Sequence, residues 1–582
     1  MLHTIINKNS YQDSINLMLL TNAVAITEGI NKVQIMMATP ANKDIFKDAG
    51  LYTEDLASAE SNDMAIVIDT DDAGKVDEVL EKVEQYLKDQ SISGKSQAFE
   101  TVRTWDRAKK TLPGANMALI SVPGQYAAEE ANKALDMGLH VFLFSDNVPV
   151  ADEVQLKQKA HEKGLLVMGP DCGTGILDGA PIAFANVVNK GRIGIVGASG
   201  TGIQEVTTII DRLGEGVSHA IGTGGRDLKE PIGAFTMMDG IKALENHQQT
   251  DVIVVISKPP AKAVRNQVVE LLHSLSKPVV TIFLGEKPTK HEGNIYQAYT
   301  LAETAKIAVD LLRGNEIKED YNAGDYTTPY VSLKPEQTAI KGLFSGGTMA
   351  SEAAVLISDA LGFGTQITNE DGYVLKRDGQ EVVDLGDDKY TQGKPHPMID
   401  PETRAKFIGK AAEDEKTAVI LLDFVLGYGS HDDMASALLP SIEKAVAHAK
   451  ENDRNLYVVA SVCGTLNDPQ DYQGHINRLQ EAGIIVKDNN NEAVRTALNI
   501  VGLHVTDEKK VHEVTDTPAK EFDLTVSEQI TAFVNSKPSI INVGLKSFTD
   551  ALVANGASVV QYDWRPIAGG NEKMRKILSL LK

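Results

Sequence analysis

The sequence predicts a multidomain α/β protein whose parallel sheets are built from repeated strand–helix–strand units. Short apolar runs alternate with amphipathic stretches almost throughout its 582 residues, which is the pattern that such units leave in a sequence. Glycine-rich turns follow several of the apolar runs, and ligands in open α/β sheets bind at turns of this kind. The chain is also longer than one hydrophobic core usually supports, so we expect several domains.

The first predicted domain spans residues 1–185 and has a Rossmann-type plan. Apolar runs at 117–122, 140–144 and 165–168 predict three strands, with a helix between the first two. An acidic segment at 63–90 contains a short apolar run and a charged helical stretch. We interpret this segment as an insertion or a small subdomain.

The second predicted domain, 190–313, contains the most informative stretch of the chain. An apolar strand runs into a turn of small residues and then into an amphipathic helix that Gly214 is placed to end. The free N–H groups at the start of such a helix suit an anion, and the helix dipole contributes up to ~2 kcal/mol. Because the turn lacks the full dinucleotide-binding spacing, phosphate binding and tight packing both remain open. The residues of this turn that we single out are Ser199, Gly200, Thr201 and Gly202.

Three further glycine-rich turns favour the phosphate-binding interpretation. Each follows an apolar run, and four such turns are more than a sheet needs for packing. One of them also contains Arg226, a cation suited to bind an anion beside the glycines. The candidate binding residues of these turns are Gly224 and Gly225; Gly346, Gly347 and Thr348; and Gly427, Gly429 and Ser430.

A polar linker at 314–335, with two prolines and few large apolar side chains, is the clearest domain boundary in the chain. The third predicted domain, 336–505, repeats the plan of the second, with a strand, a glycine turn and a helix. A second polar stretch at 507–521 precedes a small C-terminal module at 522–582, which contains two predicted strands.

The formal net charge of −23 opposes binding to nucleic acid or to an anionic membrane surface, but it leaves a small anionic substrate open. The two cysteines, Cys172 and Cys463, lack metal-ligand spacing and indicate no disulfide framework, so no bound metal is expected. The first residues lack a signal-peptide pattern, and no apolar run is long enough to span a bilayer. We therefore expect a cytoplasmic protein.

The order of these motifs resembles that of a known enzyme family. The stretch GRIGIVGASGTGIQE at 191–205 and the turn at 222–227 are similar to the α subunit of NDP-forming succinyl-CoA synthetase. The third domain resembles the C-terminal domain of the β subunit of that enzyme. The whole chain resembles the FdrA family, which fuses these parts. The matching stretches are QDSINLM, TPANK, LLVMGPDCGTG, FANVV, SKPPAKAV, DLGDDKYTQGKPHPMIDP and DWRPIAGGN.

The resemblance implies a CoA-binding-like Rossmann domain followed by flavodoxin-like domains, but several residues depart from the synthetase pattern. Residues 7–18, where the synthetase has a glycine-rich CoA loop, contain no glycine. His291 aligns with the histidine that the synthetase phosphorylates, but its neighbours differ, and we interpret it as a surface histidine. Lys258 stands where the synthetase has a glutamate, and no ATP-grasp domain precedes the third domain. The sequence therefore contains no recognisable domain or residue pattern for the nucleotide-dependent half of the synthetase reaction.

Through the FdrA family the resemblance implies carbamoyl transfer in purine (allantoin) breakdown, in which oxalurate and phosphate give oxamate and carbamoyl phosphate. In the relatives two helix N-termini converge on the phosphate, and their counterparts here are residues 199–202 and 427–430. We expect Lys258 and Arg226 to bind the carboxylate of the substrate. Phosphate is then a substrate, and no further cofactor is implied.

Two other functions stay open. One is an NDP-forming acyl-CoA synthetase, which would bind CoA and a nucleotide, and the other is a non-catalytic regulatory subunit. For each function we expect a small anionic ligand, other protein subunits and an oligomer.

His396 is a third catalytic candidate, because it lies between two prolines close to Asp387 and Asp388, as in an acid–base cluster on a rigid loop. A Mg²⁺ ion at the two aspartates is an alternative that their spacing does not support. For Asp400, membership of this cluster and a role as cap of the helix that follows both stay open. Trp564 is expected to pack at an interface.

Overall fold

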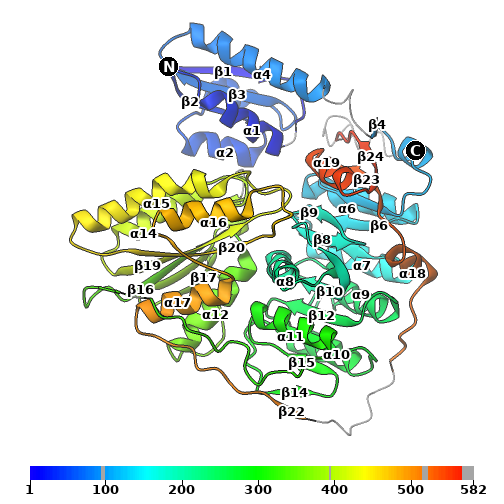
Figure 1. Ribbon diagram of the computed structural model, residues 1–582. Helices are drawn as coiled ribbons and strands as arrows, with labels where there is room; N and C mark the ends of the chain where they lie inside the picture. The colour runs from blue at the N-terminus through cyan, green and yellow to red at the C-terminus, as the bar shows by residue number, and fades with distance from the viewer. Residues whose placement is uncertain are drawn as a thin grey trace.

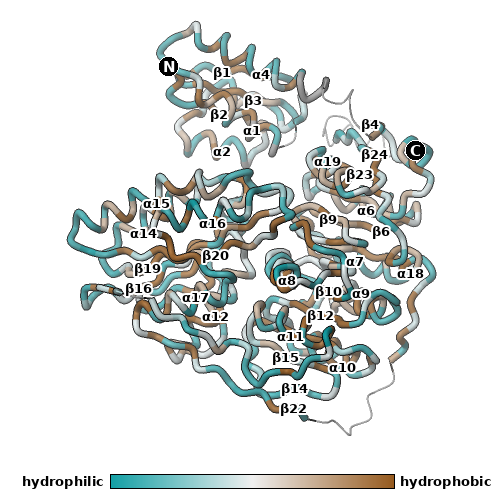
Figure 2. Tube along the Cα trace, viewed as in Figure 1, coloured by the Kyte–Doolittle hydropathy of each residue, from teal (hydrophilic) through white to brown (hydrophobic). Residues whose placement is uncertain are grey.

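The computed structural model describes residues 1–8, 10–12, 14–92, 99–328, 330–391, 395–513 and 522–566. These residues form four sheets with helices packed against them (Figure 1). Figure 2 shows hydrophobic residues along the strands and hydrophilic residues on the outer helical turns. Within the described ranges, no helix is long and apolar enough to cross a membrane.

The N-terminal domain is a three-stranded antiparallel sheet with helices on both faces (Figure 1). Its elements are β1 (Leu2–Asn7), α1 (Ser14–Ala25), β2 (Ile30–Met37), α2 (Pro40–Asp48), α3 (Glu54–Ser58), β3 (Met64–Thr70) and α4 (Gly74–Ile92), and the strand order is β1-β3-β2. Side chains of β3 alternate between two cores, so Ile66 packs with α1 and α4, and Val67 with α2 and α3. The acidic segment at 63–90 supplies the central strand and a covering helix. It is therefore an integral part of a small domain and not an insertion.

The second sheet has six parallel strands, and its domain has a Rossmann-type plan. Its first elements are β4 (Glu100–Val102), α5 (Trp105–Thr111), β5 (Met117–Ile120), α6 (Gly124–Asp136), β6 (His140–Leu143), α7 (Val150–Glu162) and β7 (Val167–Met168), and its last are α18 (Glu528–Val534), β23 (Ser539–Val543), α19 (Ser547–Ala554) and β24 (Ser558–Tyr562). The strand order is β4-β24-β23-β5-β6-β7.

This order corrects the prediction of a separate C-terminal module. Strand β23 lies between β24 and β5, so residues 522–566 complete the sheet of the first Rossmann-type domain. Without β23, strand β5 would be a sheet edge with unpaired backbone groups. The rest of the predicted module, 567–582, lies outside the described residues.

The third sheet has nine strands, of which the central ones are parallel. Its elements are β8 (Thr174–Leu177), β9 (Ala180–Ala183), β10 (Lys190–Ala198), α8 (Gly200–Arg212), β11 (Val217–Gly222), α9 (Phe235–Asn246), β12 (Val252–Ser257), α10 (Lys262–Leu272), β13 (Val279–Phe283), β14 (Lys290–Glu292), β15 (Ile295–Gln297), α11 (Leu301–Arg313) and β22 (Val511–Glu513), in strand order β22-β14-β15-β13-β12-β10-β11-β8-β9. The hairpin β8–β9 precedes the boundary expected at residue 185, yet it pairs with β11 and belongs to this sheet.

The fourth sheet has six strands in the order β17-β18-β16-β19-β20-β21. Its elements are β16 (Ala339–Phe344), α12 (Gly347–Ala360), β17 (Tyr373–Arg377), β18 (Gln380–Asp384), α13 (Asp388–Thr391), α14 (Glu402–Glu413), β19 (Thr417–Val425), α15 (Met434–Glu451), β20 (Tyr457–Cys463), α16 (Tyr472–Glu481), β21 (Ile485–Lys487) and α17 (Asn490–Ile500). Every residue of β19 is buried, as expected for a central parallel strand with both faces covered.

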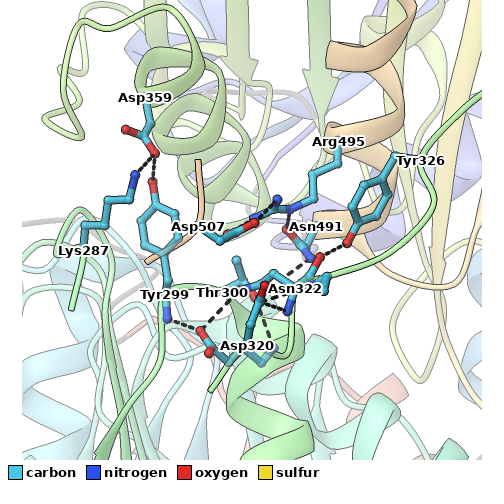
Figure 3. Close-up of polar contacts among 12 residues, drawn as sticks. Lys287, Tyr299, Thr300, Asp320, Asn322, Tyr326, Asp359, Asn491, Arg495 and Asp507 are labelled. Carbon is cyan, nitrogen blue, oxygen red and sulfur yellow. Dashed lines mark hydrogen bonds and ion pairs between the residues drawn. The ribbon is translucent and has the colours of Figure 1, made fainter. Parts of the chain in front are cut away.

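A buried polar network joins the domains of the third and fourth sheets (Figure 3). The Thr300 hydroxyl, at the start of α11, donates to Asn322 Oδ1 at 2.9 Å, and Asn491 Nδ2 of α17 donates to the same oxygen at 3.3 Å. Arg495 donates in turn to Asn491 Oδ1 at 2.7 Å. Asn322 belongs to the predicted linker 314–335 and is itself buried. The linker is therefore part of the interface that sets α8 and α12 relative to each other.

Candidate functional site

Helices α8 and α12, from two different sheets, begin against each other. Ser199 caps α8 by accepting a hydrogen bond from the Gly202 N–H at 3.1 Å, and its hydroxyl lies 2.7 Å from Thr348 Oγ1. The Thr348 N–H donates to Thr201 Oγ1 at 3.3 Å. We use the name two-helix site for residues 199–202 and 346–348 together with Asp171, Lys258 and Asp384.

Glycines allow this close approach. A Cβ atom at Gly346 would lie 2.9 Å from Thr201 Cγ2, and one at Gly202 would lie 3.0 Å from Thr348 Cγ2. The N–H groups of Gly200 and Thr201, the first two residues of α8, have no acceptor among the described residues. These two donors are therefore free to bind an anion at the helix N-terminus.

A buried aspartate holds the turn that precedes α12. Asp423, on β19, accepts from the N–H groups of Ser345 and Gly346, both at 2.8 Å. Arg404 pairs with the same carboxylate at 3.1 Å, and both side chains are buried. Because these two N–H groups are taken, the donors that α12 can offer to a ligand begin at Gly347.

Lys258 and Asp384 lie on the same side of Gly347. Lys258 directly follows β12, and Asp384 is the last residue of β18. A Cβ atom at Gly347 would lie 3.1 Å from Lys258 Nζ and 2.2 Å from Asp384 Oδ2. Among the residues that the structure describes, the Lys258 ammonium makes no hydrogen bond and no ion pair within 4.0 Å. It is therefore available to a ligand.

Asp171 brings a third strand end to this place. It follows β7 and has a left-handed φ of 53°, which aspartate tolerates better than most residues. Desolvation raises the pKa of Asp171 and that of Asp384 to about 6, and nearby Lys258 opposes the rise in both cases. Asp171 keeps its contact with solvent, whereas Asp384 is only 7% exposed. Turns after strands of three different sheets thus meet around Lys258.

His396 lies beside Asp384 and is half-buried. Its Nδ1 accepts from the Met398 N–H at 3.2 Å, which assigns the proton of the neutral ring to Nε2. A Cβ atom at Gly386 would lie 2.6 Å from that Nε2 and 3.2 Å from Asp384 Oδ1. Burial, together with a smaller effect of the nearby Arg404, lowers the pKa of His396 to about 4. His396 is therefore a neutral hydrogen-bond donor at the edge of the two-helix site.

Arg226 is held away from the helix ends. Its Nε pairs with Glu153 at 2.9 Å, and its guanidinium donates to the Val148 carbonyl at 2.9 Å. The glycines of its turn serve close packing, since a Cβ atom at Gly224 would lie 2.3 Å from the Pro170 carbonyl oxygen. Gly225 lies next to the Asp171 carboxylate and gives an anion no favourable contact there.

The turn at 427–430 is not the helix end that lies against the start of α8, which corrects our expectation, although the neighbouring Leu426 carbonyl accepts from Gln204 Nε2 of α8 at 3.4 Å. Gly427 and Gly429 have positive φ and pack against residues 184–186, where a Cβ atom at Gly429 would lie 2.1 Å from the Phe184 ring. Helix α15 begins only at Met434, behind its own cap. Ser430 Oγ is buried and has no hydrogen-bond partner in the described part of the chain. The partner of α8 is instead the turn that begins α12.

Asp387 and Asp388 form no metal site with their described neighbours. Asp387 accepts from the Lys389 N–H and from Asn369 Nδ2, both at 3.1 Å, as a turn residue does. Asp388 is exposed, and desolvation together with Asp146 and Asp387 raises its pKa. In the described ranges no group of three or more histidine, cysteine or acidic side chains could hold a metal ion.

Two further expectations concern His291 and Trp564. His291 is buried, at 3% exposure, and its Nδ1 accepts from the Gln297 N–H at 3.0 Å, so the interpretation as a surface histidine is wrong. Trp564 is buried against the rings of Tyr11 and Tyr126, so it packs inside this chain, between the N-terminal domain and the domain of the second sheet. His291 lies on β14, near the outer edge of the third sheet and not at the helix ends.

The sequence analysis missed Asp171, Asp384 and Asp423. Each stands in or directly after a buried apolar run, where a strand meets its carboxyl-end turn. The only available signal was this position, and it is shared by many aspartates that merely cap turns. The DLGDD motif drew attention to Asp387 and Asp388, but the residue inside the site is Asp384.

Three family models match parts of the chain. A CoA-ligase model matches residues 343–500, and a CoA-binding-domain model matches residues 188–285. A model described as AllF, heavy metal-associated domain matches residues 1–102. The CoA-binding match lies in the domain of the third sheet, whereas we had expected this likeness in residues 1–185.

Two known proteins and one solved structure are similar to larger or smaller parts of the chain. The Escherichia coli protein named uncharacterized protein YahF is 41% identical over 495 residues, which are 83% of this chain and 95% of that one. Subunit alpha 1 of the ADP-forming succinate–CoA ligase of Archaeoglobus fulgidus is 27% identical over 203 residues, which are 33% of this chain and 68% of that one. ATP citrate lyase from Methanothrix soehngenii, in complex with citrate and coenzyme A, matches at 12% identity with a TM-score of 0.31, over 78% of this chain and 86% of that one.

The N-terminal domain lacks the ligands that a heavy-metal ion needs. Soft metal ions are bound chiefly by thiolates, and residues 1–102 contain no cysteine and a single histidine, His3. The residues of this domain therefore do not fit a heavy metal, despite the description of the family model that matches them.

Proposed function

This chain belongs to the family of the Escherichia coli protein YahF, and on that premise we propose that it is a component of an FdrA-type carbamoyltransferase. The proposed reaction converts oxalurate and phosphate to oxamate and carbamoyl phosphate. The AllF-type N-terminal domain supports a relation to allantoin degradation. The CoA-ligase and CoA-binding matches support a chemistry in which a phosphate is bound and transferred. We also propose that the chain works with other subunits.

The observation that carries the proposal is the meeting of two helix N-termini beside an unpaired lysine. The N–H groups of Gly200 and Thr201 and the Lys258 ammonium are free donors within one site. Donors that are fixed before the ligand arrives stabilise a phosphate or a developing oxyanion without reorganisation. The contact between Ser199 and Thr348 holds the two helix ends next to each other.

The proposed step is an attack of phosphate on a carbamoyl group. An oxygen of hydrogen phosphate forms a bond to the carbamoyl carbon of oxalurate, and the bond from this carbon to the nitrogen of the oxamate part breaks. The proton of hydrogen phosphate ends on the departing nitrogen, so atoms and charge balance. The free N–H groups and Lys258 bind the phosphate, and the Nε2–H of His396 is a further donor toward the leaving group. Arg226, near Asp171, is our candidate for the substrate carboxylate.

A second candidate function is an NDP-forming acyl-CoA synthetase, which the CoA-ligase match favours. The N-terminus of α8 suits a phosphate of CoA as well as free phosphate. The synthetase reaction also needs a phosphorylated histidine, and the aligned residue, His291, is buried with its Nδ1 already accepting a hydrogen bond. The third candidate, a non-catalytic subunit, requires that a partner supply the reacting groups.

The test is an activity assay of the full chain, alone and with any subunits that co-purify. Carbamoyl phosphate and oxamate are supplied, and released phosphate and oxalurate are measured; parallel reactions contain ATP, CoA and succinate. We expect turnover in the first set that is lost in Lys258→Ala and kept in Lys262→Ala, an exposed lysine of α10. Turnover only in the second set would establish the synthetase instead. Absence of turnover in both sets, with partners present, would favour the function of a non-catalytic subunit.

A further inference from the structure

Two buried glutamates join the domains of the third and fourth sheets by exchanging hydrogen bonds. Glu205, on α8 of the third-sheet domain, accepts from the N–H of Asn490, the first residue of α17, at 2.8 Å. Glu352, on α12 of the fourth-sheet domain, accepts from the N–H of Leu301, the first residue of α11, at 2.7 Å. Each glutamate therefore binds the start of a helix that belongs to the other domain.

Asn490 connects the two carboxylates. Its side-chain Nδ2 donates to Glu352 Oε2 at 2.7 Å, while its backbone N–H is bound to Glu205 Oε1. Glu205 and Glu352 are each 1% exposed, and Asn490 is fully buried. Both carboxyl groups thus belong to one network inside the interface between the two domains.

Two negative charges in this network would have no cation beside them. Among the described residues, no nitrogen of a lysine, arginine or histidine lies within 4.0 Å of either carboxylate. Arg212 and Arg495 act on the pair only from a distance, because Arg212 donates to backbone carbonyls and Arg495 is paired with Asp507. The other titratable groups that face Glu205 are Asp423 and Cys463. An ionised carboxylate buried without a cation is costly, and such a group takes up a proton instead.

The hydrogen bonds of the network also lack one donor. Glu205 Oε2 and Asn490 Oδ1 are both buried and have no hydrogen-bond partner among the described residues. The thiol of Cys463 lies near Glu205, but a thiol is only a weak donor. A proton on Glu205 Oε2 turns this acceptor into an O–H donor, which is the kind of group that the Asn490 oxygen lacks. One proton therefore removes the surplus negative charge and adds the missing donor.

The pKa values of the two carboxyl groups agree with this arrangement. Burial raises the pKa of Glu205. Burial, together with the nearby Glu205, raises the pKa of Glu352 to about 7. Because two carboxyl groups that interact in this way titrate as a pair, the proton belongs to the pair and not to one residue.

We propose that Glu205 and Glu352 share one proton at neutral pH, and that this proton makes the docking of the third-sheet and fourth-sheet domains depend on pH. When the proton is lost, two buried negative charges repel each other across Asn490 and weaken the contacts with α11 and α17. The raised pKa means that the docking is strongest in mild acid and weakens as the pH rises through about 7. Helices α8 and α12 also begin at the two-helix site, so a rise in pH loosens that site as well. The inference does not rest on the proposed reaction, because it concerns only the contact between two domains.

The experiment follows hydrogen exchange of the full chain between pH 6 and pH 8.5. Peptides that contain residues 301 and 490 report the protection of the two N–H groups, after correction for the intrinsic exchange rate at each pH. We expect this protection to fall about 10-fold over the range in the unaltered chain, as for one group that titrates near pH 7.

Glu205→Gln tests the shared proton. Its amide oxygen keeps the bond from the Asn490 N–H, and its NH₂ group is a permanent donor in place of Oε2. Protection in this variant should therefore change by less than ~2-fold between pH 6 and pH 8.5. The matched control is Glu443→Gln, at an exposed glutamate of α15, which should keep the ~10-fold fall. In infrared spectra at pH 6, the C=O band of protonated carboxyl groups should be weaker in Glu205→Gln and in Glu352→Gln than in the control.

Each outcome decides the inference. A fall in protection that persists in Glu205→Gln, constant protection in the unaltered chain, or a carboxyl band of equal strength in all variants overturns the shared proton. A fall that disappears in Glu205→Gln and remains in the control supports it. If Glu205→Gln loses protection throughout the chain, it is misfolded, and the same comparison between Glu352→Gln and the control decides.

Discussion

The hydroxyl groups of Ser199 and Thr348 lie 2.7 Å apart and join the first turns of two helices that belong to different sheets. Both residues are buried, so water does not replace this contact. Ser199 also caps its own helix, and Thr348 donates its N–H to Thr201 across the same boundary. The free donors of α8 therefore keep their position only as long as the two domains stay docked at this point.

The first prediction concerns this contact. Thr348→Val keeps the volume of the side chain and removes its hydroxyl, so Ser199 loses its partner across the boundary. We expect phosphate affinity to fall by about 5- to 10-fold, the equivalent of one buried hydrogen bond. Isothermal titration with inorganic phosphate measures the effect. Thr207→Val, whose hydroxyl donates to the Gln204 carbonyl of its own helix at 3.1 Å, is the matched control and should bind phosphate normally. Equal losses in both variants would show that the contact has no special role.

The second prediction separates the two cations. Lys258 is unpaired within the described residues, whereas Arg226 is bound to Glu153 and to a backbone carbonyl. We therefore expect Lys258→Met to weaken phosphate binding by ~10- to 100-fold, as for loss of a charge-assisted bond. Arg226→Gln should weaken it by less than ~5-fold. Competition between phosphate and a fluorescent phosphate analogue gives both values. A larger loss of affinity in Arg226→Gln than in Lys258→Met would indicate that phosphate binds at the turn at 222–227.

Local pattern was enough to predict the strand–turn–helix units of the site. The strand, the glycine turn and the helix around Ser199 are consecutive in the sequence. The spacing of apolar residues and the position of the glycines are therefore enough to predict them. The same holds for Gly346 and Gly347. These predictions depend only on residues that are close in sequence. The structure confirms the predicted strands and helices as β10 and α8 and as β16 and α12.

Contacts between distant segments could not be predicted in this way. Ser199 and Thr348 are 149 residues apart, and their meeting depends on the docking of two complete domains. The order of motifs favoured residues 427–430 as the second helix end, but Gly429 is needed for close packing against Phe184. The position of β23 beside β5 likewise brings together residues from opposite ends of the chain. A periodic pattern defines a strand but not its neighbour in the sheet.

The third prediction concerns the buried pair that holds the turn before α12. Arg404→Met leaves the Asp423 carboxylate buried without its cation, which typically costs 3–5 kcal/mol, so we expect a large loss of thermal stability on the order of that figure. Arg192→Met removes the cation from an exposed pair with Asp251 and should cost far less stability. Scanning calorimetry compares the two variants with the unaltered chain. Similar small losses in both would mean that Asp423 is stabilised mainly by the N–H groups of Ser345 and Gly346.

The last prediction uses pH to test whether Asp384 is kept for function at the expense of stability. Burial raises its pKa to about 6, above the ordinary 3.8 of an aspartate. Between these two values the folded chain binds a proton that the unfolded chain has lost, so the contribution of Asp384 to stability falls as pH rises from about 4 to 6. Above pH 6 the charged group destabilises the fold on the order of 2–3 kcal/mol.

Asp384→Asn should therefore be more stable than the unaltered chain at pH 7.5. The gain in melting temperature should shrink as the pH is lowered from 7.5 to 5, since the aspartate then takes up its proton. Calorimetric scans of both proteins at matched ionic strength measure this trend, with Asp378→Asn, at the exposed turn before β18, as the variant that should show none. A loss of stability at pH 7.5 would mean that Asp384 is held by favourable contacts with Lys258, so that its charge stabilises the fold.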